Sequence, residues 1–137
     1  MSIREAGQSM ENLERAISRL EEALAENEKD SLYVDGTIQR FELTFDLFWK
    51  TLKRLLEEEG IETKTPRETL KQAYAVGWLQ NEYSWLQMLK DRNETSHVYD
   101  EERARQIYEH ITDYFPDMKK TFEALKVRYM EREREEE

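Results

Sequence analysis

The sequence predicts an all-α protein, an up-and-down four-helix bundle with a kinked last helix. Apolar residues recur every three or four positions over long stretches, and no segment shows sustained alternation with a period of two. Charged residues make up 38% of the chain, against about 25% in an average domain, and such a balance suits amphipathic helices. With 137 residues and no cysteine, the chain is long enough for one core without a disulfide.

The first two predicted helices have the clearest apolar periodicity. The first covers residues 9–28, with Ser9 as its N-cap, and its apolar side chains are Met10, Leu13, Ile17, Leu20 and Leu24. The second helix follows the polar residues 27–31 and ends at about Glu59. Its aromatic residues are assigned to the core rather than to ligand stacking: Phe41, Phe45, Phe48 and Trp49. Gly60 follows, because glycine adopts the left-handed conformation of a helix end without a Cβ penalty.

Two shorter helices are predicted in the middle of the chain. Residues 65–68, Thr-Pro-Arg-Glu, combine a capping box with proline at the first helical position, so a helix begins there. Gly77 ends it. Asn81 or Ser84 then caps a helix that runs to about Asn93, after which the periodicity fails for a few residues.

Asp100 is the expected cap of the last helix, whose apolar pattern continues to Tyr129. Pro116 lies inside this pattern, and proline removes a backbone donor and clashes with the preceding turn. We therefore expect a kink near residues 112–116 rather than two helices end to end, since the pattern stays in phase. Residues 1–130 form a single domain in this interpretation, and residues 131–137 form a charged, frayed tail.

Composition excludes several classes of protein. The net charge of −10 argues against broad electrostatic binding of nucleic acid, so any phosphate contact must be local. No apolar run is long enough for a membrane span or a signal peptide, which predicts a cytoplasmic protein without membrane contact. The chain has only His97 and His110, with no His-Glu-x-x-His motif and no glycine-rich phosphate loop. No metal or cofactor is expected.

The segment 91–100 is unusually polar for a junction between helices. Arg92 and His97 are five residues apart and would point about 140° from each other on one continuous helix. They converge only if the helix ends between them, where Thr95 or Ser96 could break it, or if they meet across a partner subunit. The segment is therefore the candidate functional site.

The spacing of this pair is weak evidence by itself. Arg105 and His110 repeat it inside the last helix, and we assign that second pair to a structural role, with its histidine partly buried or at the surface. For Arg92, the alternative to a functional role is a surface ion pair with Asp91 or Glu94.

The stretch from Arg92 to Tyr99 resembles the Arg-x4-His-x-Tyr signature of the HEPN superfamily, in particular its HepT-like branch, also known as nucleotidyltransferase substrate-binding proteins. Residues 38–53 resemble the second helix of this family, and residues 65–79 resemble its middle. The similarity extends over residues 10–127 in the expected order.

This resemblance implies a helical homodimer and a minimal nucleotidyltransferase as partner protein. In toxin members of the family, the HEPN subunit is a metal-independent ribonuclease acting on RNA, and the partner is an antitoxin that transfers AMP to the motif tyrosine, here Tyr99. The alternative role is a non-catalytic subunit that binds substrate for the nucleotidyltransferase. The sequence leaves both open.

The residue chemistry fits RNA cleavage. An imidazole titrates near roughly pH 6.5 and suits proton transfer, and His97 would take that role. Arg92 would hold the phosphate through its planar guanidinium, Asn93 would orient the reacting groups, and Thr95 or Ser96 would contact phosphate more weakly. Tyr99, besides being the expected AMP acceptor, could contact the substrate by stacking on a base or by hydrogen-bonding the phosphate. One His97 per chain is one too few for paired acid and base catalysis, so a dimer would complete the site.

One compact basic cluster lies on the second helix, at Lys50, Lys53 and Arg54. These residues could guide RNA toward the site. Because glutamates occupy positions 57–59, we instead assign the cluster to a solvated face with ion pairs four residues apart.

Overall fold

The computed structural model describes residues 3–26, 30–97 and 100–136. Within these ranges the chain forms helices and no β-strand. The helices are α1 (Ile3–Ala25), α2 (Ser31–Glu58), α3 (Pro66–Ala75), α4 (Glu82–Glu94) and α5 (Glu101–Glu136), with a short 3₁₀ turn, η1 (Thr95–His97), after α4.

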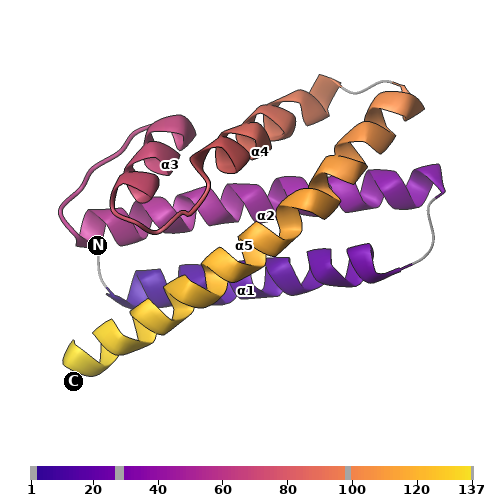
Figure 1. Ribbon diagram of the computed structural model, residues 1–137. Helices are drawn as coiled ribbons and strands as arrows, with labels where there is room; N and C mark the ends of the chain where they lie inside the picture. The colour runs from indigo at the N-terminus through magenta and orange to yellow at the C-terminus, as the bar shows by residue number, and fades with distance from the viewer. Residues whose placement is uncertain (1–2, 27–29, 98–99, 137) are drawn as a thin grey trace.

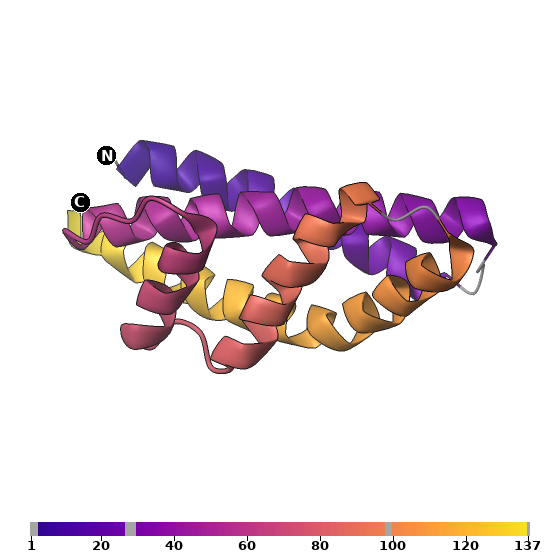
Figure 2. The same cartoon turned by 90° about the horizontal axis from the view of Figure 1, so that it is seen from above.

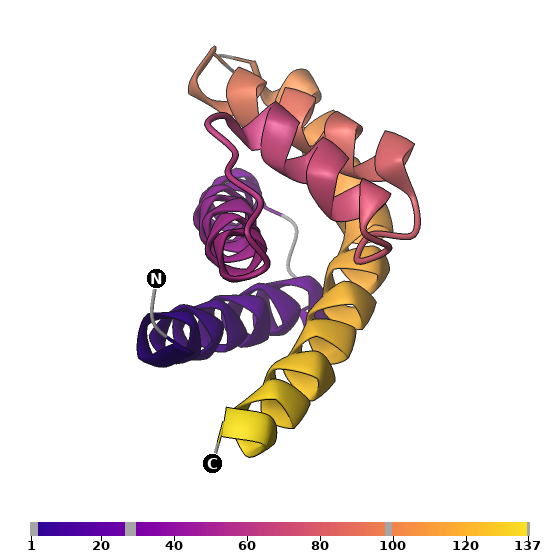
Figure 3. The same ribbon diagram turned by 90° about the vertical axis from the view of Figure 1, so that its left-hand side faces the viewer.

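The helices run alternately up and down, with the short α3 and α4 together taking the place of one long helix (Figure 1). Seen toward the end of the bundle, α2 lies between α1 and the pair formed by α3 and α4, and α5 passes along one side (Figure 3). The predicted all-α bundle is confirmed. The end of α4 and the start of α5 lie toward the same end of the bundle as the end of α1 and the start of α2 (Figure 1).

The core lies around α2, which contributes eleven buried residues. The ring of Phe48 meets Trp85 of α4 edge-on, with ring centroids 4.7 Å apart, a geometry that aromatic pairs favour. The largest fully buried side chains come from every helix: Leu13, Leu20, Phe41, Phe45, Phe48, Leu52, Leu56, Leu70, Trp85, Met88 and Ile107, joined by Leu79 before α4. The apolar stripes identified in the sequence therefore face one another.

The predicted helix ends are well reproduced. The hydroxyl of Thr65 accepts a hydrogen bond from the backbone N–H of Glu68, and Asn81, not Ser84, caps α4 by accepting from the backbone N–H of Ser84. Gly60 and Gly77 have φ of 81° and 88°, the left-handed conformation expected of residues that end helices. The main difference is at α1, which begins at Ile3 rather than near Ser9, because the buried Ala6 extends its apolar face by one turn.

The last helix continues through Pro116 and bends along its course (Figure 2), as the unbroken apolar pattern predicts. Residues 131–136, expected to be a frayed tail, are helical here, and Arg132 lies 2.6 Å from a carboxylate oxygen of Glu59. None of the helices in the described ranges has the length and apolar character that a membrane-spanning helix needs.

Candidate functional site

The α-helix ends between Arg92 and His97, as convergence of the two residues requires. Helix α4 stops at Glu94, and the chain tightens into η1. The backbone carbonyl of Arg92 accepts a hydrogen bond from the backbone N–H of Thr95 and a second one, of 2.7 Å, from the hydroxyl of Thr95. The break that the sequence assigned to Thr95 or Ser96 is thus made with the help of Thr95.

The guanidinium of Arg92 is held by α2. Its Nε and Nη2 atoms each donate a hydrogen bond of 2.9 Å to the carboxylate of Asp46, and Nη1 lies 3.9 Å from Glu42. This two-bond geometry fixes the plane of the guanidinium. The surface ion pair with Asp91 or Glu94 considered from the sequence is therefore wrong for Arg92, because its side chain faces α2 rather than its own helix.

The hydrogen bonds that Arg92 donates to Asp46 raise the pKa of Arg92, so the guanidinium keeps its charge at every relevant pH. Its side chain is 27% exposed. Asp46 accepts from Nε and Nη2, and Glu42 lies beyond hydrogen-bond distance of Nη1. N–H groups on Nη1 and Nη2 can therefore still donate to an anion that approaches from solvent.

A hollow of about 380 Å³ lies beside Arg92. We call it the α2–α4 hollow, and its lining residues are Phe45, Asp46, Trp49, Lys50, Pro66, Leu89, Arg92, Asn93 and Ser96. The structure thereby brings together three of the predicted site residues, Arg92, Asn93 and Ser96. Thr95 does not line the hollow, because its hydroxyl faces the carbonyl of Arg92.

His97 is the last residue of η1 and is exposed. Among the described residues, none forms a hydrogen bond or ion pair with its imidazole, and His97 is absent from the lining of the α2–α4 hollow. Tyr99, the expected AMP acceptor, lies outside the residues that the structure describes.

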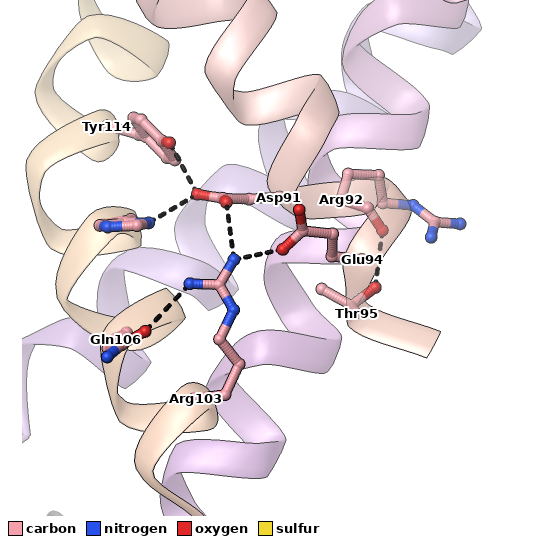
Figure 4. A network of polar contacts seen from close by, with 8 residues as sticks. Asp91, Arg92, Glu94, Thr95, Arg103, Gln106 and Tyr114 are labelled. Atoms are coloured by element: carbon pink, nitrogen blue, oxygen red, sulfur yellow. Dashed lines mark hydrogen bonds and ion pairs between the residues drawn. The ribbon is translucent and has the colours of Figure 1, made fainter. Parts of the chain in front are cut away.

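On the other side of α4, Asp91 is the centre of a polar cluster with α5. The carboxylate of Asp91 is buried, with the residue only 3% exposed. It accepts hydrogen bonds from the hydroxyl of Tyr114 at 2.7 Å and from Nδ1 of His110 at 2.8 Å, and Arg103 lies 3.8 Å away. Figure 4 shows Arg92 pointing away from this group of side chains, which we call the Asp91 cluster.

Charge and burial explain how the Asp91 cluster is held. Burial, and then the hydrogen bond to Asp91, raises the pKa of Tyr114, so its phenol remains a donor. Arg103 also binds Glu94 and donates to Gln106 at 3.1 Å, and its hydrogen bond lowers the pKa of Glu94. The cluster joins α4 to α5 on both sides of the connection that carries the motif.

Sequence reasoning missed the Asp91 cluster. It considered Asp91 only as a partner for Arg92 in a surface ion pair, whereas the carboxylate of Asp91 is buried. The sequence analysis correctly assigned His110 to a structural role, but it did not identify Asp91 as the hydrogen-bond partner of His110. A usable signal exists, because polar side chains on α5 recur three, four and four residues apart along one face, at Arg103, Gln106, His110 and Tyr114.

No group of three His, Asp or Glu side chains in the described part of the chain is arranged to hold a metal ion. The polar groups of the α2–α4 hollow are instead mostly hydrogen-bond donors. Such a donor set suits an anion, and the apolar side chains beside it suit a flat organic group.

The fold and the site give the class of protein, and comparison with known proteins gives the family. The fold and the site define a helical-bundle protein that carries an arginine and a histidine around the end of one helix. Residues 8–127 match the family model described as nucleotidyltransferase substrate binding protein like. The chain belongs to this family.

Similar proteins agree with that assignment. A protein of Haemophilus influenzae, described as a probable ribonuclease HepT, is 31% identical over 100 residues, which are 69% of this chain and 68% of that protein. A crystal structure from Thermus thermophilus has 35% identity and a TM-score of 0.77, and the match covers 82% of this chain and 98% of that one.

A second solved structure, again from Haemophilus influenzae, has the same fold. Its TM-score is 0.66 at 24% identity, and the match covers 91% of this chain and 99% of that one. That structure is described as revealing the fold of a substrate-binding domain of a nucleotidyltransferase. The predicted HepT-like membership is confirmed.

Proposed function

We propose that this protein is a HEPN-type, metal-independent RNA endonuclease. The observation that carries the proposal is that Arg92, Asn93 and Ser96 of the motif line one hollow, where the guanidinium of Arg92 is partly exposed and the exposed His97 follows Ser96 directly. The similarity to a probable ribonuclease HepT supports the same activity.

The residues would share the reaction in the following way. One imidazole takes the proton of the RNA 2′-hydroxyl, and the 2′-oxygen attacks the adjacent phosphorus. The bond from phosphorus to the 5′-oxygen breaks, and a second imidazole donates a proton to that oxygen. Arg92 stabilises the negative charge on the phosphorane through the N–H groups that Asp46 leaves open.

We further propose that the protein acts as a homodimer, because each chain brings one His97 and the reaction uses an acid and a base. The other histidine, His110, already donates its Nδ1 hydrogen to Asp91 in the cluster between α4 and α5. Two copies of His97 at a shared site would provide both proton-transfer groups. Asn93 and Ser96, which line the α2–α4 hollow, would position the RNA beside them.

A minimal nucleotidyltransferase is the proposed partner and antitoxin, with the phenol oxygen of Tyr99 as the acceptor of AMP. The family to which the chain belongs supports this pairing. AMP attached two residues after His97 would bring a bulky anion next to the motif and block RNA by size and by charge.

The test is cleavage of a mixed RNA pool by the purified protein in excess EDTA. We expect wild-type protein to leave 2′,3′-cyclic phosphate ends, and His97→Ala to lose about 10²- to 10⁴-fold in rate. Stability should not change, because His97 is exposed and forms no hydrogen bond with any described residue.

The chain offers its own matched controls, because Arg105 and His110 have the same spacing within α5. The variants Arg105→Ala and His110→Gln should cleave RNA like the wild type, while Arg92→Ala should not. Equal cleavage by wild type and His97→Ala would exclude the proposed chemistry.

The second candidate is a non-catalytic subunit that binds substrate for a nucleotidyltransferase. The family description and the net charge of −10, unusual for a nuclease acting on bulk RNA, favour it. If dimeric, unmodified protein cleaves no RNA at any practical concentration, this function takes precedence, and AMP transfer to Tyr99 becomes the next measurement.

A further inference from the structure

The α2–α4 hollow has an aromatic wall that the sequence did not predict. Trp49, assigned to the core from its place in the apolar stripe, is only partly buried. It lines the hollow beside Leu89 and Pro66. An indole at the surface of a hollow offers a flat apolar face to a ligand.

The same hollow has polar donors without partners. Among the described residues, none forms a hydrogen bond or ion pair with the side chains of Lys50, Asn93 or Ser96, or with the indole N–H of Trp49. The prediction of a solvated ion-pair face is confirmed for Lys53, whose ammonium lies 2.9 Å from Glu57, but it is wrong for Lys50.

The charges around the hollow favour a single anionic group at its rim. Asp46 also lines the hollow, but both of its carboxylate oxygens accept hydrogen bonds from Arg92. The positive charge of Lys50 has no such partner. An anion placed between Lys50 and Arg92 would therefore meet the ammonium of Lys50 and the guanidinium of Arg92. The carboxylates beside that guanidinium are Asp46, whose oxygens are both occupied, and Glu42, which lies 3.9 Å from Nη1 and does not line the hollow.

We propose that the α2–α4 hollow binds one nucleotide unit, with its base stacked on Trp49 and its phosphate at Lys50 and Arg92. The proposal rests on the proposed function, since it places a nucleotide of the RNA beside the motif. The volume of about 380 Å³ falls within the range of small-molecule sites. Asn93 and Ser96 supply donors for the edge of the base or for the sugar.

The first test measures binding without cleavage. A fluorescent RNA with 2′-O-methyl groups cannot be cut by attack of the 2′-oxygen, so its fluorescence anisotropy in EDTA reports binding alone. We expect Trp49→Ala to weaken binding by about 5- to 150-fold, the value of one base stacked on an aromatic ring. Trp49→Phe, which keeps a ring and a core contact, should retain most of the affinity.

Tyr83→Ala is the matched control, because Tyr83 is an aromatic residue of α4 that is 73% exposed and does not line the hollow. Its binding should equal that of the wild type. Thermal unfolding of each variant separates loss of the site from loss of the fold. Equal binding by folded Trp49→Ala and wild type would overturn the proposal.

A second variant tests the phosphate contact independently of Trp49. Lys50→Ala should weaken binding and reduce the dependence of log K on log salt by about 0.7, the value for one phosphate contact to a single strand. Lys120→Ala is the control, because Lys120 is an exposed lysine of α5 without a partner among the described residues. An unchanged salt slope in Lys50→Ala would contradict the phosphate position.

The source of the nucleotide is decided by a parallel measurement with free AMP. Binding of RNA that depends on Trp49 supports a site for the RNA chain, and binding of AMP alone supports a site for a free nucleotide. If the wild type binds neither, the proposal fails. If binding depends on Trp49 but the wild type cleaves no RNA, the nucleotide site stands and the nuclease function is rejected. If the wild type cleaves RNA but binding does not depend on Trp49, the nuclease function stands and the nucleotide site is rejected.

Discussion

Asp91 and Arg92 are neighbours in the chain, but they face two very different regions of the molecule. Successive residues of an α-helix point about 100° apart, so Asp91 is directed to α5 and Arg92 to α2. The carboxylate of Asp91 is buried and accepts from Tyr114 and His110. The guanidinium of Arg92 is partly exposed. The α2–α4 hollow beside it contains hydrogen-bond donors that have no acceptor among the described residues.

This difference separates stabilisation from binding. A polar group that is buried and fully hydrogen-bonded contributes to the fold, because removing one partner leaves the others without compensation. A polar group that stays open to solvent costs little to leave unpaired and remains available for a ligand. The Asp91 cluster therefore fixes the helices on either side of the motif, while the Arg92 side is available to bind substrate.

The largest effect on stability should come from Asp91→Ala. This change leaves the hydroxyl of Tyr114 without its acceptor in a partly buried position and removes the acceptor of the hydrogen bond that His110 donates. We expect a loss of about 3 kcal/mol in the free energy of unfolding, seen as a fall of roughly 10 °C in Tm. Chemical denaturation followed by circular dichroism measures the free energy of unfolding, and thermal unfolding measures Tm.

Tyr114→Phe is the matched control, because it removes only one of these hydrogen bonds and keeps the ring that packs on Phe41. Its cost should be about 1 kcal/mol. If Asp91→Ala costs no more than Tyr114→Phe, the cluster does not hold the junction as described.

In contrast to Asp91→Ala, the variant Asp46→Ala should have a small effect on stability and a larger effect on activity. The ion pair with Arg92 is partly exposed, so we expect a loss below about 1 kcal/mol in stability. RNA cleavage should fall about tenfold, because the guanidinium would lose its fixed orientation. Steady-state kinetics should show the loss in kcat/KM.

Asp46→Asn should restore part of the activity, because the amide oxygen can still accept one hydrogen bond from Arg92. Asp35→Ala, at an exposed position on the same helix, should leave cleavage unchanged. A loss of stability from Asp46→Ala as large as that from Asp91→Ala would remove the distinction between the two sides.

The smallest effect should be the dependence of stability on acid through Glu94. The hydrogen bond from Arg103 lowers the pKa of Glu94 below 4.5, the ordinary value for a glutamate. The folded protein thus binds this proton less tightly than the unfolded chain. The stabilisation is complete above that ordinary value and is lost as the pH falls through the folded pKa.

Thermal unfolding from about pH 6 to about pH 3 tests this sign, because wild-type stability should fall more steeply than that of Glu94→Gln. The difference should be small, since solvent screens this exposed carboxylate. Glu109→Gln, an exposed position on α5, is the control and should follow the wild type. Parallel curves for wild type and Glu94→Gln would remove any role of the ion pair.

Much of the fold could be predicted from local patterns. The apolar stripes, the caps at Thr65 and Asn81 and the glycines at 60 and 77 act within a few residues of one another. Apart from Trp49 in the second stripe, they have the predicted roles. The end of a helix between Arg92 and His97 was recognised as a condition for the site, because it depends on helical geometry alone.

The partners of these residues could not be predicted in the same way. Arg92 meets Asp46, a residue 46 positions earlier, and Asp91 meets His110 and Tyr114 in a helix that follows the motif. Such contacts depend on how far each helix is rotated and shifted against the next, which local periodicity does not determine.

The sequence by itself determined the helical bundle, the position of the motif and the family, since these follow from periodicity, capping and a recognisable signature. Only the tertiary structure decided which polar groups are buried together and which are left open. The physical reason is that a hydrogen-bond partner is determined by distance in space. Asp91 therefore became part of the stable core, and Trp49, expected in that core, became one wall of a hollow.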